Sequence, residues 1–345
     1  MKVLFCGDKH LKINRFDLAK SFLSWLNEQL VIVKPDLYVC LGDDMDGHSI
    51  ICSQLLAELR FHFDYILSLG IPIIYVVGNH DGFRPNSITY HALQSMVGIH
   101  KNFYVIDKVQ DLFGMTFVPF IYDPLLFPTR TLPICVAHQT FRGSDYGAII
   151  TKDGVDSTLL KGTEIVISGH IHKRQRFQAS KDSADILYVG SPFSQSASDI
   201  NQVKGISIFD TETYAEIFIQ CPMPMWRSAS FTVDPVYTLE CIHNDLMYTL
   251  NDTDHWVIEL TGPKAELIGY LGSKGSREIL AKKNIKVKTV FTDKEKKLIQ
   301  IKATSINLII GEYIDKVYTG AIDRELLKKT TLGIITSSTD ADMVQ

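Results

Sequence analysis

The chain has 345 residues, 46% of them hydrophobic and 21% charged, and a formal net charge of −4. This length predicts two or three domains of about 100–200 residues each, and the composition is that of an ordinary globular protein. The slightly acidic balance excludes a uniformly basic nucleic-acid coat protein, although local basic patches remain possible.

Two further features predict a cytoplasmic protein. The six cysteines are scattered and form no C-x-x-C pair, which favours buried free thiols in a reducing compartment over disulfides. The apolar run at the N-terminus is too short for a signal peptide, and no run approaches the about 20 apolar residues of a membrane span. We therefore expect no contact with a membrane.

The first 81 residues alternate between strands and helices. Short apolar, β-branched runs predict buried strands, and apolar residues at helical spacing predict the helices between them. This β-α-β-α-β order predicts parallel strands joined by right-handed crossovers. The predicted elements are, in chain order, 2–7, 16–33, 36–41, 50–69 and 71–77.

Beyond residue 81 the pattern becomes a succession of strands. Residues 103–106 and 115–119 predict an antiparallel pair, and five more strands are predicted further along the chain. Together these elements predict the α/β class, as a four-layer α/β/β/α sandwich in which two sheets face each other between helices. The five later strands are predicted at 133–137, 164–168, 186–190, 205–209 and 216–220.

Pro222 and Pro224 predict a junction between two parts of the chain. We divide the chain into a first domain at 1–222, a smaller α+β domain at 225–303 and a helical segment at 304–345. Apolar residues at helical spacing in the first half of this segment predict packing on its own domain. The part after Gly320 is expected to be available for a partner, and the polar end to be frayed.

Five short motifs follow predicted strands, where the carboxyl ends of parallel strands present ligands. They are Asp8-x-His10, Gly42-Asp43-x-x-Asp46, Gly78-Asn79-His80-Asp81, His138 and Gly169-His170-x-His172. Their imidazoles, carboxylates and amide are enough to hold two metal ions that share one carboxylate, as in an in-line phosphoryl displacement. Such ligands without a thiolate suit Mn, Fe or Zn rather than Ca or a Cys-based structural zinc, and Mg stays an alternative. The seven candidate ligands are Asp8, His10, Asp43, Asn79, His138, His170 and His172.

The remaining polar residues of these motifs have other predicted roles. His80 is the candidate general acid, and Asp46, three residues after Asp43, is the candidate carboxylate that orients it. Asp81 is expected to hold its loop through backbone N–H groups. The role of His48, two residues after Asp46, stays open. For all these residues, capping helices and closing turns is the structural alternative.

These motifs resemble those of the calcineurin-like metallophosphoesterases over about residues 1–220. The resemblance implies that Asp43 bridges the two metals and that His80 and Asp46 are the family's acid and its orienting carboxylate. The charged Lys9 departs from the expected pattern, so its role is open. The implied ligand sets are Asp8, His10, Asp43 and His172 for one ion, and Asp43, Asn79, His138 and His170 for the other.

The segments His172-Lys173-Arg174-Gln175 and 188–192 resemble those of SbcD-type nucleases, including the phage recombination subunits. The resemblance implies a Mn-dependent DNA exo- and endonuclease of recombination and double-strand-break processing, in the host cytoplasm if a phage encodes it. It also implies a capping domain at 225–303 and a homodimer through helices 16–33 and 50–69. An SMC-like coiled-coil ATPase would complete a heterotetramer, bound through the C-terminal segment.

Basic residues in two regions are candidates for contacts with DNA phosphates, which are independent of sequence and sensitive to salt. The alternative for the lysine-rich region is a solvated face. Two other functions also remain open: a phosphatase or small-molecule phosphodiesterase on the same site, and a non-catalytic DNA-binding scaffold. The candidate DNA contacts are Arg142, Lys173 and Arg174 near the predicted metals, and Lys282, Lys283, Lys286 and Lys288 in the second domain.

Overall fold

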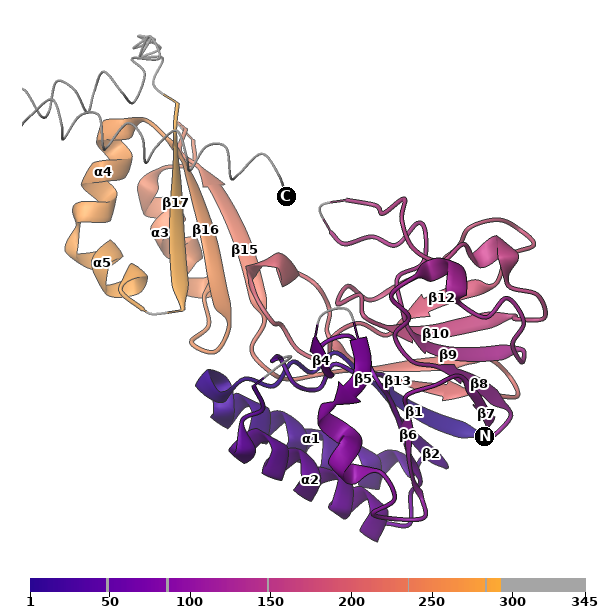
Figure 1. Ribbon diagram of the computed structural model, residues 1–345. Helices are drawn as coiled ribbons and strands as arrows, with labels where there is room; N and C mark the ends of the chain where they lie inside the picture. Colours follow the sequence, from indigo (N-terminus) through magenta and orange to yellow (C-terminus); the bar gives the residue numbers. More distant parts are fainter. Residues whose placement is uncertain (48–49, 85–86, 148, 235, 283, 293–345) are drawn as a thin grey trace, which may run out of the picture.

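A computed structural model describes residues 1–292 except 48, 49, 85, 86, 148, 235 and 283. Two large sheets lie face to face in the N-terminal part of the chain, and a smaller sheet with its own helices follows (Figure 1). The predicted segment 304–345, His48 and Lys283 lie outside the described residues. Among the helices that are described, none has the length and apolar character needed to cross a bilayer.

The first sheet has six strands in the order β14-β13-β1-β2-β3-β6. β1, β2, β3 and β6 are parallel, as right-handed crossovers through α1 and α2 require. β13 is antiparallel to β1, and β14 to β13. The bounds are β1 Lys2–Cys6, α1 Phe16–Val33, β2 Leu37–Cys40, α2 Ser53–Ser68, β3 Ile73–Val76, β6 Phe103–Ile106, β13 Gly205–Asp210 and β14 Glu216–Gln220.

The second sheet also has six strands, in the order β11-β12-β10-β9-β8-β7. Its four inner strands are parallel, and the edge strands β7 and β11 are antiparallel to their neighbours. A short antiparallel ribbon, β4 and β5, follows β3. The bounds are β4 Gly82–Arg84, β5 Ser87–His91, β7 Gln110–Leu112, β8 Met115–Val118, β9 Ile134–His138, β10 Ile165–Gly169, β11 Gln175–Gln178 and β12 Asp185–Tyr188.

Two strands pair differently from the sequence-based expectation. β6 pairs in parallel with β3, and β8 pairs in parallel with β9. The sequence-based expectation is instead an antiparallel pair of β6 and β8. The chain leaves the first sheet after β6 and enters the second at β7, so that β6 and β8 belong to different sheets. Within residues 103–118, the antiparallel pair is the hairpin β7–β8, with Gln110 opposite Phe117. The short connection between β6 and β7 therefore crosses from the first sheet to the second and does not join two neighbouring strands of one sheet.

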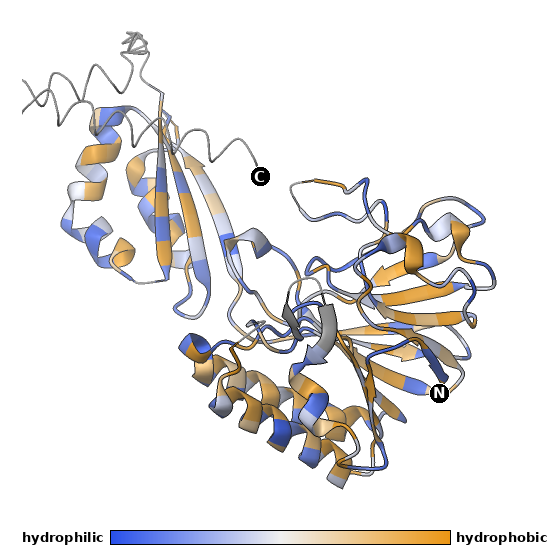
Figure 2. Cartoon of the chain, in the orientation of Figure 1, coloured by the Kyte–Doolittle hydropathy of each residue, from blue (hydrophilic) through white to orange (hydrophobic). Residues whose placement is uncertain are grey.

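Apolar residues fill the space between the layers, where the strands are mostly hydrophobic (Figure 2). Buried side chains such as Val39 of β2 and Val136 of β9 form the core between the two sheets. α1 and α2 cover the outer face of the first sheet, with buried residues at intervals of three and four. Over the second sheet, the described residues form loops and the 3-10 turns Pro124–Leu126 and Ser157–Leu159. The predicted sandwich is therefore present, with short turns as its fourth layer.

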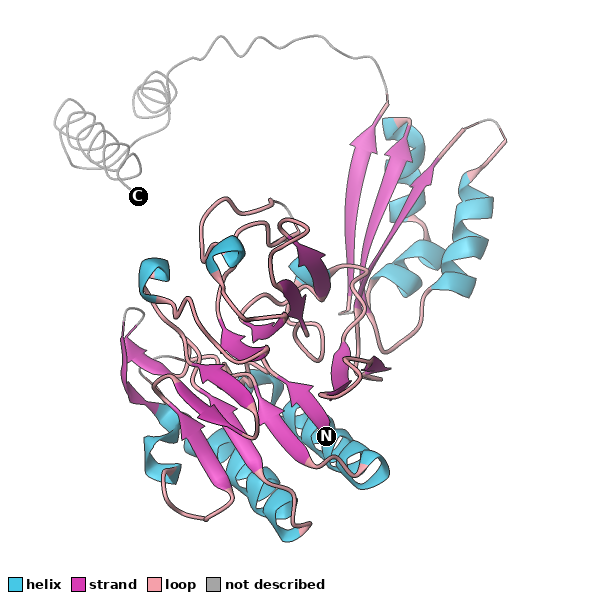
Figure 3. Cartoon of the chain, turned by 90° about the vertical axis from the view of Figure 1, so that its right-hand side faces the viewer, coloured by secondary structure: helices cyan, strands magenta, loops and turns pink. Residues whose placement is uncertain are grey.

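β15, β16 and β17 form a third, fully parallel sheet, with α3, α4 and α5 as its crossovers (Figure 3). Its core, which includes Trp256 and Leu267, is separate from the others. At the junction, the N–H of Asn201 donates to the Trp226 carbonyl at 2.8 Å, and the N–H of Trp226 donates to Ser194 Oγ at 3.3 Å. The bounds are β15 Trp226–Thr232, α3 Leu239–Thr249, β16 His255–Gly262, α4 Lys264–Gly272, α5 Lys274–Leu280 and β17 Ile285–Phe291.

Candidate metal centre

The loops after β1 and β2 of the first sheet meet the strand ends of the second sheet at one edge. The N–H of Asp8 donates to the Gly42 carbonyl at 2.9 Å, and the N–H of His10 donates to the Asp43 carbonyl at 3.0 Å. The N–H of His170, after β10, donates to Asp8 Oδ1 at 2.9 Å. These bonds bring motifs that are more than 160 residues apart into one site.

Four residues of this site have a left-handed backbone: Asp8, His10, Asp43 and His170 have φ values of 53°, 41°, 54° and 82°. Each such conformation costs a non-glycine residue about 1–3 kcal/mol, and functional sites are where such strain concentrates. Gly78 serves the site in another way, because a Cβ there would lie 2.8 Å from His138 Cε1 and closer still to the Asp43 carboxylate.

Asp43 lies at the centre of the site. Its Oδ2 is 3.1 Å from His138 Nε2 and 3.9 Å from His10 Nε2, while its Oδ1 accepts a hydrogen bond from the N–H of His80 at 2.8 Å. Asn79 Oδ1 lies 3.1 Å from His138 Nε2 and 2.8 Å from His170 Nδ1. One carboxylate therefore contacts ligands from both predicted metal sets.

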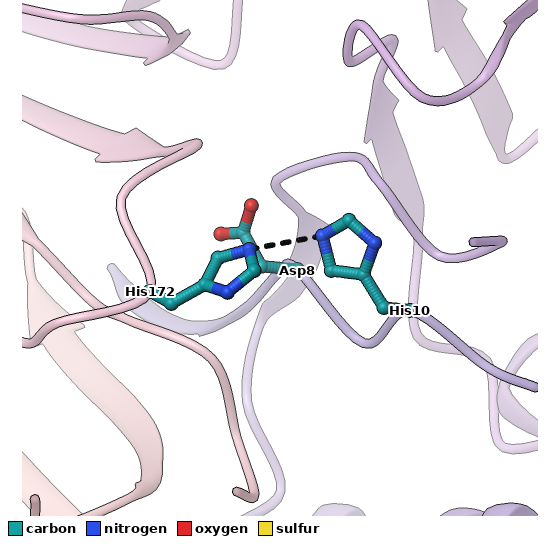
Figure 4. A group of neighbouring side chains, drawn as sticks. All are labelled: Asp8, His10 and His172. Carbon is teal, nitrogen blue, oxygen red and sulfur yellow. Dashed lines mark hydrogen bonds between the residues drawn. The ribbon is translucent and has the colours of Figure 1, made fainter. Parts of the chain in front are cut away.

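In the part of the chain that the structure describes, three groups of side chains bring their ligand atoms within 4.8 Å of one another. The first, Asp8, His10 and His172, belongs to one predicted set, and Figure 4 shows the two imidazoles facing each other beside the carboxylate. The second, Asp43, His138 and His170, belongs to the other predicted set. The third joins His80 to His10 and Asp43. The structure thus brings all seven predicted ligands together.

The arrangement of lone pairs fits a divalent cation at each set. His138 Nδ1 lies 2.6 Å from the Leu41 carbonyl; when it donates there, a neutral ring has no hydrogen on Nε2. That nitrogen nevertheless faces oxygens of Asp43 and Asn79. Likewise, His172 Nε2 is 3.0 Å from His10 Nε2. A cation satisfies such converging acceptors, and these nitrogen and oxygen donors suit Mn, Fe or Zn.

The pKa values of the imidazoles agree with this assignment. Burial lowers the pKa of His170 and of His172 to about 3, so both rings are neutral and offer a lone pair. Burial also disfavours the charged form of His138, but the neighbouring Asp43 carboxylate outweighs burial and raises its pKa to about 9. A metal ion bound at His138 would therefore displace a proton.

His80 and Asp46, the candidate acid and its predicted orienting residue, lie together, with a contact through the main chain of Asp46. The Asp46 carboxylate is 3.5 Å from His10 Nδ1 and 3.2 Å from Lys12 Nζ. His80 Nδ1 instead lies 3.3 Å from the backbone carbonyl oxygen of Asp46. The main chain thus provides the contact to the candidate acid, and the carboxylate supports a candidate metal ligand.

Replacing Asp46 with asparagine is therefore expected to weaken one of two metal-binding steps by about 10–100-fold, the usual effect of losing a carboxylate behind a ligating histidine. Titration with Mn²⁺, followed by calorimetry, measures both steps. Asp182→Asn, on an exposed turn, is the matched control. Unchanged metal affinity with impaired cleavage would instead return Asp46 to the predicted role of orienting His80.

Asp81 holds the loop after β3, as predicted. Its Oδ2 accepts hydrogen bonds from the N–H groups of Gly78 at 2.9 Å and Asp43 at 3.0 Å. Its Oδ1 accepts a hydrogen bond from the Tyr75 hydroxyl at 2.8 Å. The two loops that carry Asp43 and His80 are thereby tied to the same carboxylate.

Lys9, whose role the sequence leaves open, is fully buried and points away from the ligands. Its Nζ forms an ion pair with Asp44 Oδ1 at 2.5 Å and lies 3.1 Å from Cys40 Sγ. Asp44 follows the central ligand Asp43, so this ion pair joins the loops after β1 and β2. In the sequence, the one indication that Lys9 has a buried partner is the second of the two adjacent aspartates in Gly42-Asp43-Asp44.

Lys9→Met is expected to lower the free energy of unfolding by at least about 3 kcal/mol, because it leaves the buried Asp44 carboxylate without its counter-charge. Urea denaturation measures the change, with Lys20→Met on an exposed position of α1 as the control. The double variant Lys9→Met/Asp44→Leu should recover most of the loss. Stability close to that of the parent protein in Lys9→Met would rule out this structural role.

The basic residues predicted to contact DNA near the metals all have acidic partners. Arg142 pairs with Asp156 at 3.0 Å, and Lys173 pairs with Asp145 at 2.5 Å. Arg174 pairs with a β14 carboxylate at 3.0 Å and lies over the Phe218 ring at 4.5 Å. In the third sheet, Lys282 pairs with an aspartate, Lys286 lies 5.1 Å above the Trp226 ring, and Lys286 and Lys288 are exposed.

The sequence did not single out Lys204 as part of the site. This buried lysine donates hydrogen bonds to the His172 carbonyl at 2.7 Å, Ser191 Oγ at 2.9 Å and Asp199 Oδ1 at 2.8 Å. It therefore fixes the main chain at a candidate ligand. A lysine directly before a buried strand was the available signal, but exposed lysines at strand ends are far more common.

A family model of calcineurin-like phosphoesterases matches residues 1–174. The chain belongs to the calcineurin-like phosphoesterase family. This phosphoesterase is 25% identical over 234 residues to exonuclease subunit 1 of Enterobacteria phage T4, across 64% of this chain and 67% of that protein. It is 26% identical over 253 residues to a subunit of the nuclease SbcCD from Staphylococcus epidermidis, across 61% of this chain and 66% of that protein.

Among solved structures, that of the Pseudomonas putida nuclease MPE aligns with this phosphoesterase at 13% identity and a TM-score of 0.32. The alignment covers 62% of this chain and 87% of that one. Membership of the family confirms the predicted enzyme class, a metal-dependent phosphodiesterase that uses divalent metal ions.

Proposed function

We propose that this phosphoesterase is a DNA exo- and endonuclease subunit that acts in recombination and double-strand-break processing with two divalent metals, Mn above all. The observation that carries the proposal is the pair of ligand groups that meet at Asp43, with His80 at the same carboxylate. The names of two relatives, an exonuclease subunit and a nuclease subunit, support DNA as the substrate.

Each predicted ligand has a place in this proposal. When bound, the two ions would neutralise charge on the phosphodiester and lower the pKa of a water molecule. His80, oriented by the Asp46 carbonyl, gives a proton to the departing 3′-oxygen. Asp8, His10, Asp43 and His172 hold one ion, and Asp43, Asn79, His138 and His170 hold the other.

The proposed capping domain at 225–303 provides contacts to the DNA backbone. Lys286 and Lys288 are two positions apart on β17 and have exposed side chains, so both lie on the same face of the strand. Both can therefore contact the phosphates of one DNA backbone. Arg142, Lys173, Arg174 and Lys282 are paired with carboxylates, but a partly exposed pair contributes only about 0–1 kcal/mol, and a phosphate can replace the partner. Lys283 stays a sequence prediction.

An SMC-like ATPase and a second copy of the chain complete the proposed assembly in the cytoplasm, with 304–345 as the ATPase-binding segment. A multi-subunit nuclease is supported by the relatives, both named as subunits. The dimer surface is proposed on α1 and α2, where Ile32 is 71% exposed and Phe61 66% exposed. A contiguous apolar patch on a surface marks an interaction site, and the proposal places these two side chains within such a patch.

The proposal is tested by incubating the full chain and Mn²⁺ with end-labelled duplex DNA, single-stranded DNA and the generic phosphomonoester p-nitrophenyl phosphate. Metal-dependent cleavage of DNA is the expected result, and the product ladder gives the polarity. Hydrolysis of the phosphomonoester alone would favour a phosphatase. Binding of DNA without hydrolysis of any substrate would favour the scaffold function.

A further inference from the structure

Two antiparallel segments, 144–147 and 149–151, together called the hairpin, stand beside the candidate metal centre and have no role in the function proposed so far. The N–H of Tyr146 donates to the Ile149 carbonyl at 2.9 Å, and the N–H of Thr151 donates to the Ser144 carbonyl at 2.9 Å. Asp145 and Ile150 form an antiparallel bridge between the two arms. The hairpin is therefore a defined element and not a loose connection.

The segment that follows the ligand His172 holds this hairpin in place. Gln175 forms two hydrogen bonds with the main chain of Asp145: its Oε1 accepts from the N–H at 2.8 Å, and its Nε2 donates to the carbonyl at 2.9 Å. Lys173 adds the ion pair to the Asp145 carboxylate. The polar residues after the Gly169-His170-x-His172 motif thus fix the hairpin, and Tyr146 with it, relative to the metal ligands.

Tyr146 lines a cavity of about 190 Å³ together with His170, His172 and Lys173, and the lining also includes Ser198, Asp199 and Gln202. Its hydroxyl lies 2.9 Å from Thr140 Oγ1, which fixes the ring, yet the residue is 45% exposed. The cavity is smaller than the roughly 300–1,000 Å³ that encloses a drug-sized ligand, so it suits one planar group.

We propose that this cavity is a base-binding subsite in which Tyr146 stacks on the nucleobase next to the scissile phosphodiester. The inference rests on the proposed nuclease function and names the part of the substrate that the metals do not contact. Every base has an aromatic face, so stacking tolerates any sequence, as a nuclease of general specificity requires. Tyr146 is in this view a specificity-determining residue for nucleoside diesters over other phosphodiesters.

The test uses a substrate with a single phosphodiester, so that the base next to the scissile bond is defined. The full chain with Mn²⁺ is given thymidylyl-(3′→5′)-thymidine and two analogues, each lacking one base. We expect one analogue to have a kcat/KM about 5- to 100-fold lower than the intact compound, through a higher KM, as the loss of one stacked base predicts. Tyr146→Ala should abolish this preference, and Tyr146→Phe, which keeps the ring, should retain it.

A binding measurement separates stacking from catalysis and from folding. An oligonucleotide with 2-aminopurine, bound with EDTA present so that no bond is cleaved, should lose fluorescence on the parent protein and on Tyr146→Phe, but not on Tyr146→Ala. Tyr248→Ala, 91% exposed on α3, is the matched control and should behave like the parent protein.

The outcomes distinguish this subsite from the nuclease function. DNA cleavage with no preference for the intact dinucleotide, or an equal preference in Tyr146→Ala, would overturn the subsite and leave the nuclease intact. If Tyr146→Ala lowered kcat/KM equally for all three diesters, the role of Tyr146 would be structural, and the subsite would be refuted. Absence of both cleavage and binding of DNA by the parent protein would overturn the proposed function and the subsite together.

Discussion

Asp43→Ala is expected to lose both metal ions and at least about 10³-fold of the phosphodiesterase activity. The Asp43 carboxylate lies close to ligands of both sets, at 3.1 Å from His138 Nε2 and 3.9 Å from His10 Nε2. Losing one hydrogen-bond donor that stabilises a transition state already lowers the rate by about 10²–10³-fold. Asp43→Ala removes the carboxylate that is proposed to hold two cations. Elemental analysis after dialysis against Mn²⁺ gives the metal content.

Asp43→Asn is the matched variant, because it keeps the shape of the side chain and the hydrogen bond from the His80 N–H while removing the charge. It should also lose metal, whereas Asp182→Asn should keep two ions and full activity. Unfolding curves of all three variants separate lost metal from lost structure. An Asp43→Ala protein that still holds two ions would refute the bridging role.

His80→Ala is expected to lower cleavage of DNA by about 10²–10⁴-fold, the usual contribution of a general acid, while both metal ions stay bound. The main-chain N–H of His80 is bonded to Asp43, so alanine keeps that contact. The ring lies against the His10 ring with centroids 4.7 Å apart, beside the ligands. Single-turnover cleavage and metal analysis are the two measurements.

The leaving group identifies the role of His80 directly. p-Nitrophenolate departs without a proton, so His80→Ala should lose far less activity on bis-p-nitrophenyl phosphate than on DNA. Equal losses on both substrates would argue against an acid. Loss of one metal ion in His80→Ala would make His80 a ligand instead, consistent with the group it forms with His10 and Asp43.

The order of elements and the chemistry of the site could be predicted from local sequence. Apolar runs that end in polar motifs indicate buried strands that present ligands, since strands and helices follow from side-chain periodicity. The prediction brought together residues as distant as Asp8 and His172, because the carboxyl ends of parallel strands converge wherever the sheets lie. The identities of the ligand atoms also favoured a metal centre before any geometry was known.

Pairings across the fold could not be predicted in this way. The strand β8 was expected to pair with β6 and instead joins a different sheet, since periodicity within a strand does not identify its neighbour. In the same way, the spacing of three positions between Asp43 and Asp46 could not show that the Asp46 carboxylate faces His10 and that the Asp46 carbonyl faces His80.

The amino-acid sequence alone predicts the seven candidate metal ligands. They are placed after strands in the order of a calcineurin-like phosphoesterase. The residues that support or adjoin these candidate ligands became apparent only from the packing of the chain. They are Lys9 buried against Asp44, Lys204 bonded to the His172 carbonyl, and Tyr146 at the cavity. The physical reason is that a ligand is recognised by its atom type and its place at a strand end, which are local. A supporting contact depends on which distant backbone carries the partner, and that follows from packing alone.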